Sequence, residues 1–264
     1  MKSSKLWLMR PLLLIATVIY VAPIPVAGAQ TVTASSTNID PAAIAALNKM
    51  GEYLRGLGAF QVRAVTTRED VLTDGEKIQT AAVADILAQR PNRLRVEVNS
   101  DDQHRLYFYD GKNFTVFAGR LGYYASAPAP PTIPRLVDLL DEKYGINVPL
   151  TDLFYWGTDK SSVGDITVAR DIGSTQVEGT TTQQYAFRQN GLDWQIWIQN
   201  GEYPLPRKLV LTTTTDDARP QYTAVLTWNL APSFNDAAFV FDPPAGANKI
   251  VLADVNAPVG ASKK

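Results

Sequence analysis

Hydrophobic residues recur at two different periods along the chain, and the period predicts which segments are helical and which are extended. From Asp40 to Gly58 the apolar positions repeat at three- and four-residue steps, which is typical of an amphipathic helix. These positions are Ile44, Leu47, Met50, Leu54 and Leu57. Asp40 is a good N-cap and Pro41 suits the first helical position, so we expect the helix to begin there and to end at Gly56 and Gly58.

The helical period returns in the middle of the chain. The positions that share one face are Ile133, Leu136, Val137, Leu140 and Tyr144. Gly145 is expected to stop this second helix, and residues 149–156 predict a further short helical turn. Residues 125–134, which contain four prolines, predict a stiff crossover that cannot continue a sheet.

Elsewhere the period is two, which predicts β-strands. A first set precedes the crossover, at residues 60–64, 78–87, 93–98, 106–109 and 114–117. A second set follows it, at residues 166–169, 183–188, 194–199, 209–214, 222–230 and 239–241. Short turns such as Asp74-Gly75, Asp110-Gly111 and Asn190-Gly191 join several of them, so neighbouring strands must be antiparallel.

Ten or eleven strands with two or three helices predict the α+β class. A twisted antiparallel sheet of this size tends to curl, so we expect an incomplete β-barrel whose opening is covered by the helices. Such a sheet can enclose an apolar cavity. No linker divides the chain, which predicts a single domain over residues 40–264 after a flexible, Ser/Thr-rich leader at residues 30–39.

The first 29 residues have the pattern of a secretory signal peptide. Lys2, Lys5 and Arg10 precede an apolar run, and Ala27-Gly28-Ala29 supplies the small residues of a cleavage site. An uncleaved anchor is the alternative, but the run is shorter than the approximately 20 residues that span a bilayer, and prolines interrupt its extension. We therefore expect cleavage after Ala29 and a mature periplasmic protein that makes at most transient contact with a membrane.

Composition removes several classes of chemistry. The chain has no cysteine and one histidine, which excludes disulfides, cysteine nucleophiles, thiolate zinc sites and a lipidated cysteine. A net charge of −1 gives no field for gathering nucleic acid, so no nucleic-acid partner is expected. Neither a nucleotide motif nor a calcium-loop spacing occurs, and we expect no cofactor and no metal.

Catalytic constellations are also weak. His104 has no G-x-S-x-G elbow to serve, so it is expected to be a structural residue. The acidic cluster of Asp138, Asp141 and Glu142 has helical spacing and predicts the solvent-exposed face of a helix. We therefore expect no catalytic residue and no enzyme activity.

Large apolar side chains on strands and helices are the remaining candidates for a ligand site. Alternation places Trp197 on the face opposite Trp194, and one of the two can line a ligand surface or stack on a sugar, although core packing is the simpler use. The cavity candidates are Leu94, Val96, Leu106, Phe108, Leu136, Leu140, Phe154 and Trp197. Alternation alone does not say which strand face is concave.

Three segments resemble a known family. Residues 200–210 (NGEYPLPRKLV), 224–232 (AVLTWNLAP) and 239–247 (FVFDPPAGA) look like the predicted periplasmic proteins grouped as domain of unknown function 2092. That family is similar in fold to the LolA and LolB lipoprotein carriers and to the LppX-type lipid carriers, in which an incomplete barrel closed by helices holds a lipid. LolB-like carriers are anchored by a lipidated cysteine, which this chain lacks, so the soluble LolA-like shuttle is the closer analogue.

The resemblance and the pattern together predict a soluble periplasmic carrier or binding protein for a lipid, a lipoprotein or another acylated ligand. The alternative is a non-catalytic cell-envelope interaction module with a filled core, which binds a protein partner or a polysaccharide. The two differ in one physical respect, because only the first requires a hollow between sheet and helices.

Overall fold

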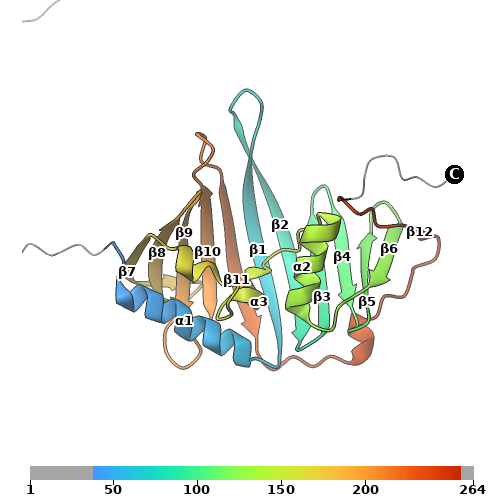
Figure 1. Ribbon diagram of the computed structural model, residues 1–264, viewed down its shortest axis with the longest axis horizontal. Helices are drawn as coiled ribbons and strands as arrows, with labels where there is room; N and C mark the ends of the chain where they lie inside the picture. Colours follow the sequence, from blue (N-terminus) through green and yellow to red (C-terminus); the bar gives the residue numbers. More distant parts are fainter. Residues whose placement is uncertain (1–37, 257–264) are drawn as a thin grey trace, which may run out of the picture. The chain divides into compact units, whose positions relative to one another are not determined.

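The computed structural model describes residues 38–256, which form one twelve-stranded sheet with three α-helices and two short 3₁₀ helices (Figure 1). The helical elements are α1 (Pro41–Gly56), α2 (Ile133–Tyr144), α3 (Asp152–Tyr155), η1 (Ser162–Asp165) and η2 (Asp236–Phe239). The strands are β1 (Ala59–Val71), β2 (Lys77–Gln89), β3 (Arg93–Ser100), β4 (His104–Tyr109), β5 (Asn113–Ala118), β6 (Tyr123–Pro128), β7 (Val168–Val177), β8 (Thr180–Gln189), β9 (Leu192–Gln199), β10 (Pro206–Thr213), β11 (Gln221–Asn229) and β12 (Asn248–Ile250).

The sheet is open. Its strand order is β12-β6-β5-β4-β3-β2-β1-β11-β10-β9-β8-β7, and the terminal strands β12 and β7 do not pair with each other. Every neighbouring pair is antiparallel except β12 and β6, which run parallel. The sheet curls around the helices, as expected for this many twisted strands. The predicted α+β class and incomplete barrel are therefore confirmed.

The three α-helices cover the concave, inner face of the sheet. In Figure 1, α1 crosses in front of the half of the sheet that ends at β7, α2 lies in front of β3 and β4, and α3 lies between the two. Local chemistry explains their ends. The Asp40 carboxylate accepts a hydrogen bond from the Ala42 amide at 2.8 Å, and Gly145 ends α2 in the left-handed conformation. Both predicted helices begin and end where the sequence places them.

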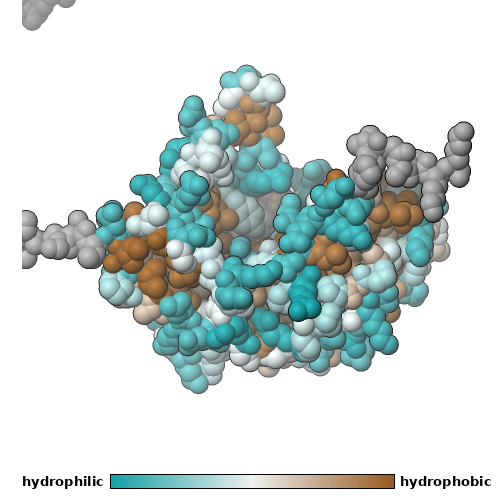
Figure 2. All heavy atoms as spheres, in the orientation of Figure 1, coloured by the Kyte–Doolittle hydropathy of each residue, from teal (hydrophilic) through white to brown (hydrophobic). Residues whose placement is uncertain are grey.

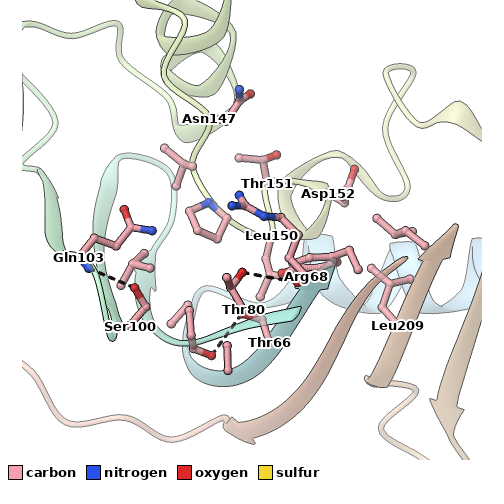
Figure 3. Close-up of a pocket in the computed structure, with 18 of the residues that line it drawn as sticks. Thr66, Arg68, Thr80, Ser100, Gln103, Asn147, Leu150, Thr151, Asp152 and Leu209 are labelled. Atoms are coloured by element: carbon pink, nitrogen blue, oxygen red, sulfur yellow. Dashed lines mark hydrogen bonds between the residues drawn. The ribbon is translucent and has the colours of Figure 1, made fainter. Parts of the chain in front are cut away.

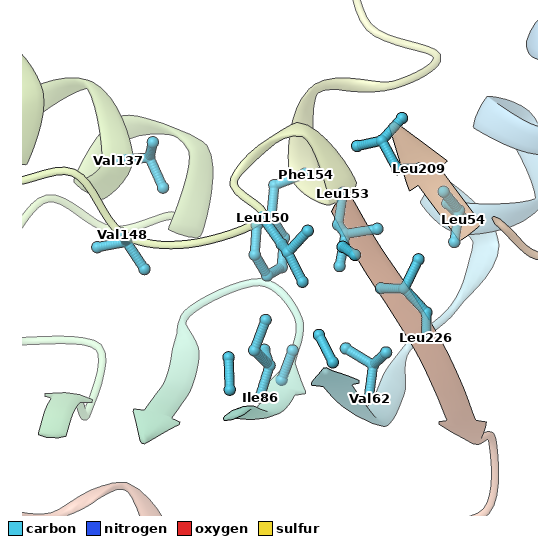
Figure 4. Close-up of a cluster of buried hydrophobic side chains, with 14 of the residues drawn as sticks. Leu54, Val62, Ile86, Val137, Val148, Leu150, Leu153, Phe154, Leu209 and Leu226 are labelled. Atoms are coloured by element: carbon cyan, nitrogen blue, oxygen red, sulfur yellow. The ribbon is translucent and has the colours of Figure 1, made fainter. Parts of the chain in front are cut away.

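Large apolar side chains fill most of the space between the sheet and the helices (Figure 4). Val62, Ile86 and Leu226 point from the central strands toward Leu153 and Phe154 of α3. Each of these five side chains is at most 2% exposed. The space between the central strands and α3 is therefore packed as tightly as an ordinary protein core.

A backbone contact between α1 and the end of α3 sets the depth at which the helices pack. Gly51 of α1 faces Gly157 so closely that a Cβ atom at Gly51 would stand 2.5 Å from the Gly157 nitrogen. Gly157 has a φ of +76°, a conformation that glycine adopts without strain. Both positions thus require glycine.

One strand lies where a crossover was expected. Residues 125–134 were predicted to be unable to join a sheet, yet β6 extends to Pro128 and pairs along its length with β5. The prediction was wrong because the first proline of the segment stands at the end of the strand, where the missing amide removes little of the ladder. The crossover is shorter than expected and begins after Pro128.

The C-terminal part of the chain also differs from the prediction. Residues 239–241 do not form a strand, because Phe239 ends the helix η2 and is fully buried. Phe241 instead contacts the outer face of the sheet, with its ring 5.1–5.4 Å from those of Phe108, Phe117 and Tyr124. The last strand is β12, a short parallel addition that alternation did not reveal.

The expected strand at residues 166–169 overlaps a longer strand, β7, only at Val168 and Ala169, and β7 continues to Val177. Ile39, assigned to the leader, forms a bridge with Ala169 on the edge strand β7. The predicted signal peptide, its cleavage site after Ala29 and most of the leader lie outside the described residues. Within residues 38–256, none of the helices has the length and apolar character needed to cross a membrane.

Candidate functional site

A hollow of about 420 Å³ remains on the inner face, at the end of the sheet from which the β1–β2 hairpin projects (Figure 3). Strands β1, β2, β3, β10 and β11 form one wall, and the connection between α2 and α3, residues 147–152, forms the other. Figure 2 shows this face of the molecule, which is hollowed between the hairpin and the connection. The volume lies within the range of about 300–1,000 Å³ that is usual for small-molecule sites.

Small side chains on the central strands create the hollow. The pairing of β1 with β2 and β11 places Thr66 beside Ala82 and Ala224, and places Ala64 beside Ala84. All five point to the inner face, because alternate residues of a strand share a side. Nearer to α1 the same strands carry larger side chains, so the space between sheet and helices is filled near α1 and open at the hollow.

We call the apolar part of the lining the floor of the hollow and the polar part its rim. The apolar lining residues include Val98, Val148, Leu150, Leu209 and Leu211. The polar lining residues are Thr66, Arg68, Thr80, Ser100, Asp102, Gln103, Asn147, Thr151, Asp152 and Tyr222. This division suits a ligand with an apolar body and a polar end.

The wall formed by the α2–α3 connection contains a strained residue. Leu150 has a φ of +57°, which is rare for a side chain larger than glycine. Its side chain is 8% exposed and lines the hollow beside Val148. Strain of this kind persists where the surrounding structure enforces it, and it is frequent at ligand sites.

Two ionisable groups of the hollow have shifted pKa values. Asp152 is accessible to solvent within the hollow, but the protein around it partly desolvates the carboxyl group and raises its pKa. Burial, assisted by the negative charge of Asp152, raises the pKa of Tyr222 to about 12. Tyr222 is therefore a neutral hydroxyl group at physiological pH.

A side-chain network ties α2 to α3 and to the segment that follows α3. The Tyr155 hydroxyl donates a hydrogen bond to Asp138 at 2.7 Å, and the Lys160 ammonium contacts the other oxygen of the same carboxylate. Burial pushes the pKa of Asp138 up, but these hydrogen bonds outweigh it and lower the pKa below its usual range. Asp138, predicted only to face water, thus fastens together the two elements that flank the connection.

Five of the eight predicted cavity residues lie together in the packed core between sheet and helices. They are Leu94, Val96, Leu136, Leu140 and Phe154, each at most 3% exposed. None of them lines the 420 Å³ hollow, although Val98, two residues beyond Val96 on the same face of β3, does.

The other three predicted residues lie on the outer face of the sheet. Leu106 and Phe108 are opposite Glu97 and Arg95 in the β3–β4 pairing, and Phe108 contacts Phe241. Trp197 also lies on the outer face, where the Lys208 ammonium is 4.7 Å from the centre of its ring. The structure therefore does not bring the eight residues into one site.

Hydrophobic periodicity does not identify the residues that form the hollow, because it selects large apolar side chains. The sequence contains a usable signal in Thr80-Ala81-Ala82-Val83-Ala84, where every inner-face position is small. Small residues on a concave face leave space, whereas large residues fill it.

Comparison with known proteins places the chain in a family. The profile of a family described as "Predicted periplasmic protein (DUF2092)" matches residues 43–253. The chain belongs to this family. No curated protein matches it.

Solved structures similar to this chain come from several bacteria. An uncharacterized conserved protein from Thermus thermophilus has 11% identity and a TM-score of 0.47, covering 80% of this chain and 99% of that one. The lipoprotein LppX from Mycobacterium tuberculosis has 13% identity and a TM-score of 0.46, covering 74% and 100%. A LolA superfamily protein from Nitrosomonas europaea has 12% identity and a TM-score of 0.37, covering 75% and 97%.

A second, almost wholly apolar groove of about 320 Å³ lies at the edge of the sheet formed by β5, β6 and β12. Its lining includes Leu121, Tyr123 and Ile250, which are 72%, 45% and 49% exposed. Apolar side chains as exposed as these can bind another apolar surface.

The histidine lines neither hollow. His104 Nε2 is 2.9 Å from Glu97 Oε1 on the outer face of β3 and β4. Among residues 38–256, no group of three or more acidic or histidine side chains has the arrangement of a metal site.

Proposed function

We propose that this protein is a periplasmic binding or carrier protein that holds an acylated ligand in the hollow beneath the α2–α3 connection. The observation that carries the proposal is the 420 Å³ space with an apolar floor and a polar rim. The membership of a family described as predicted periplasmic supports the location of such a protein.

The floor supplies the affinity. Leu209, Leu211, Val98 and Val148 line the hollow, and a ligand chain placed among them would leave water. Each methylene group removed from water contributes about 0.8 kcal/mol. A short stretch of hydrocarbon is therefore sufficient for useful binding.

The same proposal assigns no catalytic step to the protein. The lining of the hollow holds Asp102 and Asp152, but His104 lies on the opposite face of the sheet. A carrier needs a site that binds and releases a ligand unchanged, and the hollow offers hydrogen bonds and apolar surface for that purpose.

The test is native mass spectrometry of the full-length protein purified without detergent, followed by removal of lipid and reloading. We expect a bound species with the mass of an acylated molecule, and we expect the stripped protein to bind a fluorescent apolar probe. A protein that is empty and binds neither lipids nor the probe would refute the proposal.

The apolar groove beside β12 favours a second candidate, in which the protein binds a partner of the cell envelope. Leu121 and Tyr123 would then form part of the contact. Leu121→Lys, which leaves the hollow intact, distinguishes the two functions. It should abolish capture of an envelope partner if the groove is the functional site, and it should leave lipid loading unchanged if the hollow is.

A further inference from the structure

Two threonine hydroxyl groups of the polar rim can only accept hydrogen bonds from a ligand. The Thr66 hydroxyl donates to the Ala82 carbonyl at 3.2 Å, and the Thr80 hydroxyl donates to the Arg68 carbonyl at 3.4 Å (Figure 3). A hydroxyl group has one hydrogen and two lone pairs. Because each hydrogen is already used, both groups are left as acceptors toward a ligand.

The rim near β3 has the same character. The Ser100 hydroxyl donates its hydrogen to the Asp102 carboxylate and accepts a hydrogen bond from the backbone N–H of Gln103 at 3.2 Å. The bond from Ser100 lowers the pKa of Asp102, so this carboxylate is ionised at neutral pH. Asp152 adds a second carboxylate from the α2–α3 connection.

The cations of this region are already engaged. Arg68 is the one basic residue in the lining, and its Nε is 3.0 Å from a carboxylate oxygen of Asp70. Arg120, which lies close to Asp102, donates to the carbonyl oxygens of Asp101 and Ser100 at 2.6 and 2.7 Å. An anionic ligand would therefore meet the Asp102 carboxylate and the Asp152 carboxyl group, and it would have to share Arg68 with Asp70.

The size of the hollow limits the apolar part of the ligand. The hollow of about 420 Å³ is the size of a site for one small molecule. That is the volume of one medium-length chain with a small head. Several acyl chains at once would not be enclosed.

We infer that the ligand is a single-chain amphiphile whose head donates hydrogen bonds and carries no negative charge, such as a polyol or an ammonium group. This inference rests on the proposed function and specifies its ligand class. The acceptors on Thr66, Thr80 and the two carboxylates receive the hydrogens of the head, while the chain lies on the apolar floor. The amides of Gln103 and Asn147 can add contacts to a hydroxylated head.

The experiment compares four probes with the same twelve-carbon chain, each below its micelle concentration. Monolauroylglycerol, dodecylammonium, dodecanoate and dodecyl phosphate compete with a fluorescent apolar probe for the stripped full-length protein. We expect the glycerol and ammonium heads to bind at least tenfold more tightly than the two anionic heads. The ratio between glycerol and ammonium shows which of the two donor-rich heads the site prefers.

The failures are distinguishable. Equal binding of all four probes, or tighter binding of dodecanoate or dodecyl phosphate, overturns the inference and leaves the carrier function in place. Binding of none of the four, while the protein also fails to load lipid, refutes the carrier function itself.

Two variants connect the preference to the rim. Asp152→Asn should reduce the ratio of dodecylammonium to dodecanoate affinity at least threefold, and Thr80→Val should weaken monolauroylglycerol binding at least threefold. Asp85→Asn is the matched control, because Asp85 lies on the outer face of β2 and pairs with Arg63 at 2.7 Å. An equal change in the affinity ratio for Asp85→Asn would show that the effect comes from the overall charge of the protein, and it would refute the assignment to the rim.

Discussion

Filling the hollow should remove ligand binding without harming the fold, and Ala82→Leu is the substitution that does so most directly. Ala82 is a half-buried residue on the inner face of β2, between Thr66 of β1 and Ser100 of β3. Its backbone carbonyl, which accepts the Thr66 hydrogen bond, is unaffected by a longer side chain. The new side chain would extend into the space that the ligand chain is proposed to occupy.

The magnitude follows from the volume that is lost. Leucine adds three carbon atoms to alanine, so about three methylene groups of the ligand are displaced from the floor. At about 0.8 kcal/mol each, binding weakens by about 2.4 kcal/mol. Since about 1.4 kcal/mol corresponds to a tenfold change, the dissociation constant should rise roughly fifty-fold.

The assay is displacement of a fluorescent apolar probe by monolauroylglycerol, with thermal unfolding followed in parallel. The midpoint of unfolding should be unchanged or higher, because the added side chain buries apolar surface in a space that is now open. Ala186→Leu is the control, since Ala186 lies on the outer face of β8, opposite Gln195. It introduces the same side chain far from the hollow and should leave affinity unchanged.

The result that would refute this reasoning is a folded Ala82→Leu protein that binds the probe and monolauroylglycerol with full affinity. Binding would then occur elsewhere, and the groove beside β12 would be the next site to examine. A fifty-fold loss in Ala186→Leu as well would indicate that the assay reports general damage to the sheet.

Three further substitutions test the framework of the site. Gly51→Ala forces a Cβ atom to within 2.5 Å of the Gly157 nitrogen, and we expect urea unfolding to show a loss of about 1–3 kcal/mol; an unchanged midpoint would mean that α1 can shift freely. Asp40→Ala removes the N-cap of α1 and should cost about 0.5–2 kcal/mol, with Asp40→Asn as the tolerated control. Burial raises the pKa of Asp152 in the folded state. The contribution of this carboxyl group to stability is therefore favourable at low pH and is lost as the pH rises from about 4 through the raised pKa. Asp152→Asn should flatten this decline of the unfolding midpoint with pH, and a parallel decline in wild type and variant would contradict the assignment.

The helices could be predicted because their signals are local. Asp40 caps α1 through the amide of Ala42, two residues away, and Gly145 ends α2 by adopting a left-handed conformation itself. Neither event depends on a distant part of the chain. Hydrophobic periodicity then identifies the buried face of each helix without knowledge of the sheet.

Several strands could not be predicted because their signals are distant or atypical. β12 is defined by its parallel pairing with β6, more than a hundred residues earlier in the chain. The β7–β8 hairpin turns at Glu178 and Gly179, both with positive φ, and glutamate is not a usual residue for that conformation. The turn therefore did not resemble one, and most of β7 was missed.

Alternation of polar and apolar residues also does not predict which residues of each strand point to the inner face of the sheet. On β4, Leu106 and Phe108 alternate with Tyr107 and Tyr109, and both pairs are apolar enough to be buried. The β3–β4 register decides between them, because Tyr109 pairs with Leu94 and therefore faces the helices. Phe108 on the outer face packs instead against Phe241, which is 133 positions later in the chain.

The position of the hollow shows how one set of strands can serve folding and binding separately. Along β2, Ile86 and Ala88 lie in the packed core near α1, whereas Thr80 and Ala82 line the hollow at the other end. A carrier needs rigid walls, and the packed end supplies them because its side chains interdigitate with the helices. It follows that substitutions near Ile86 should change stability first and binding only as a consequence, while substitutions near Ala82 should change binding at nearly constant stability.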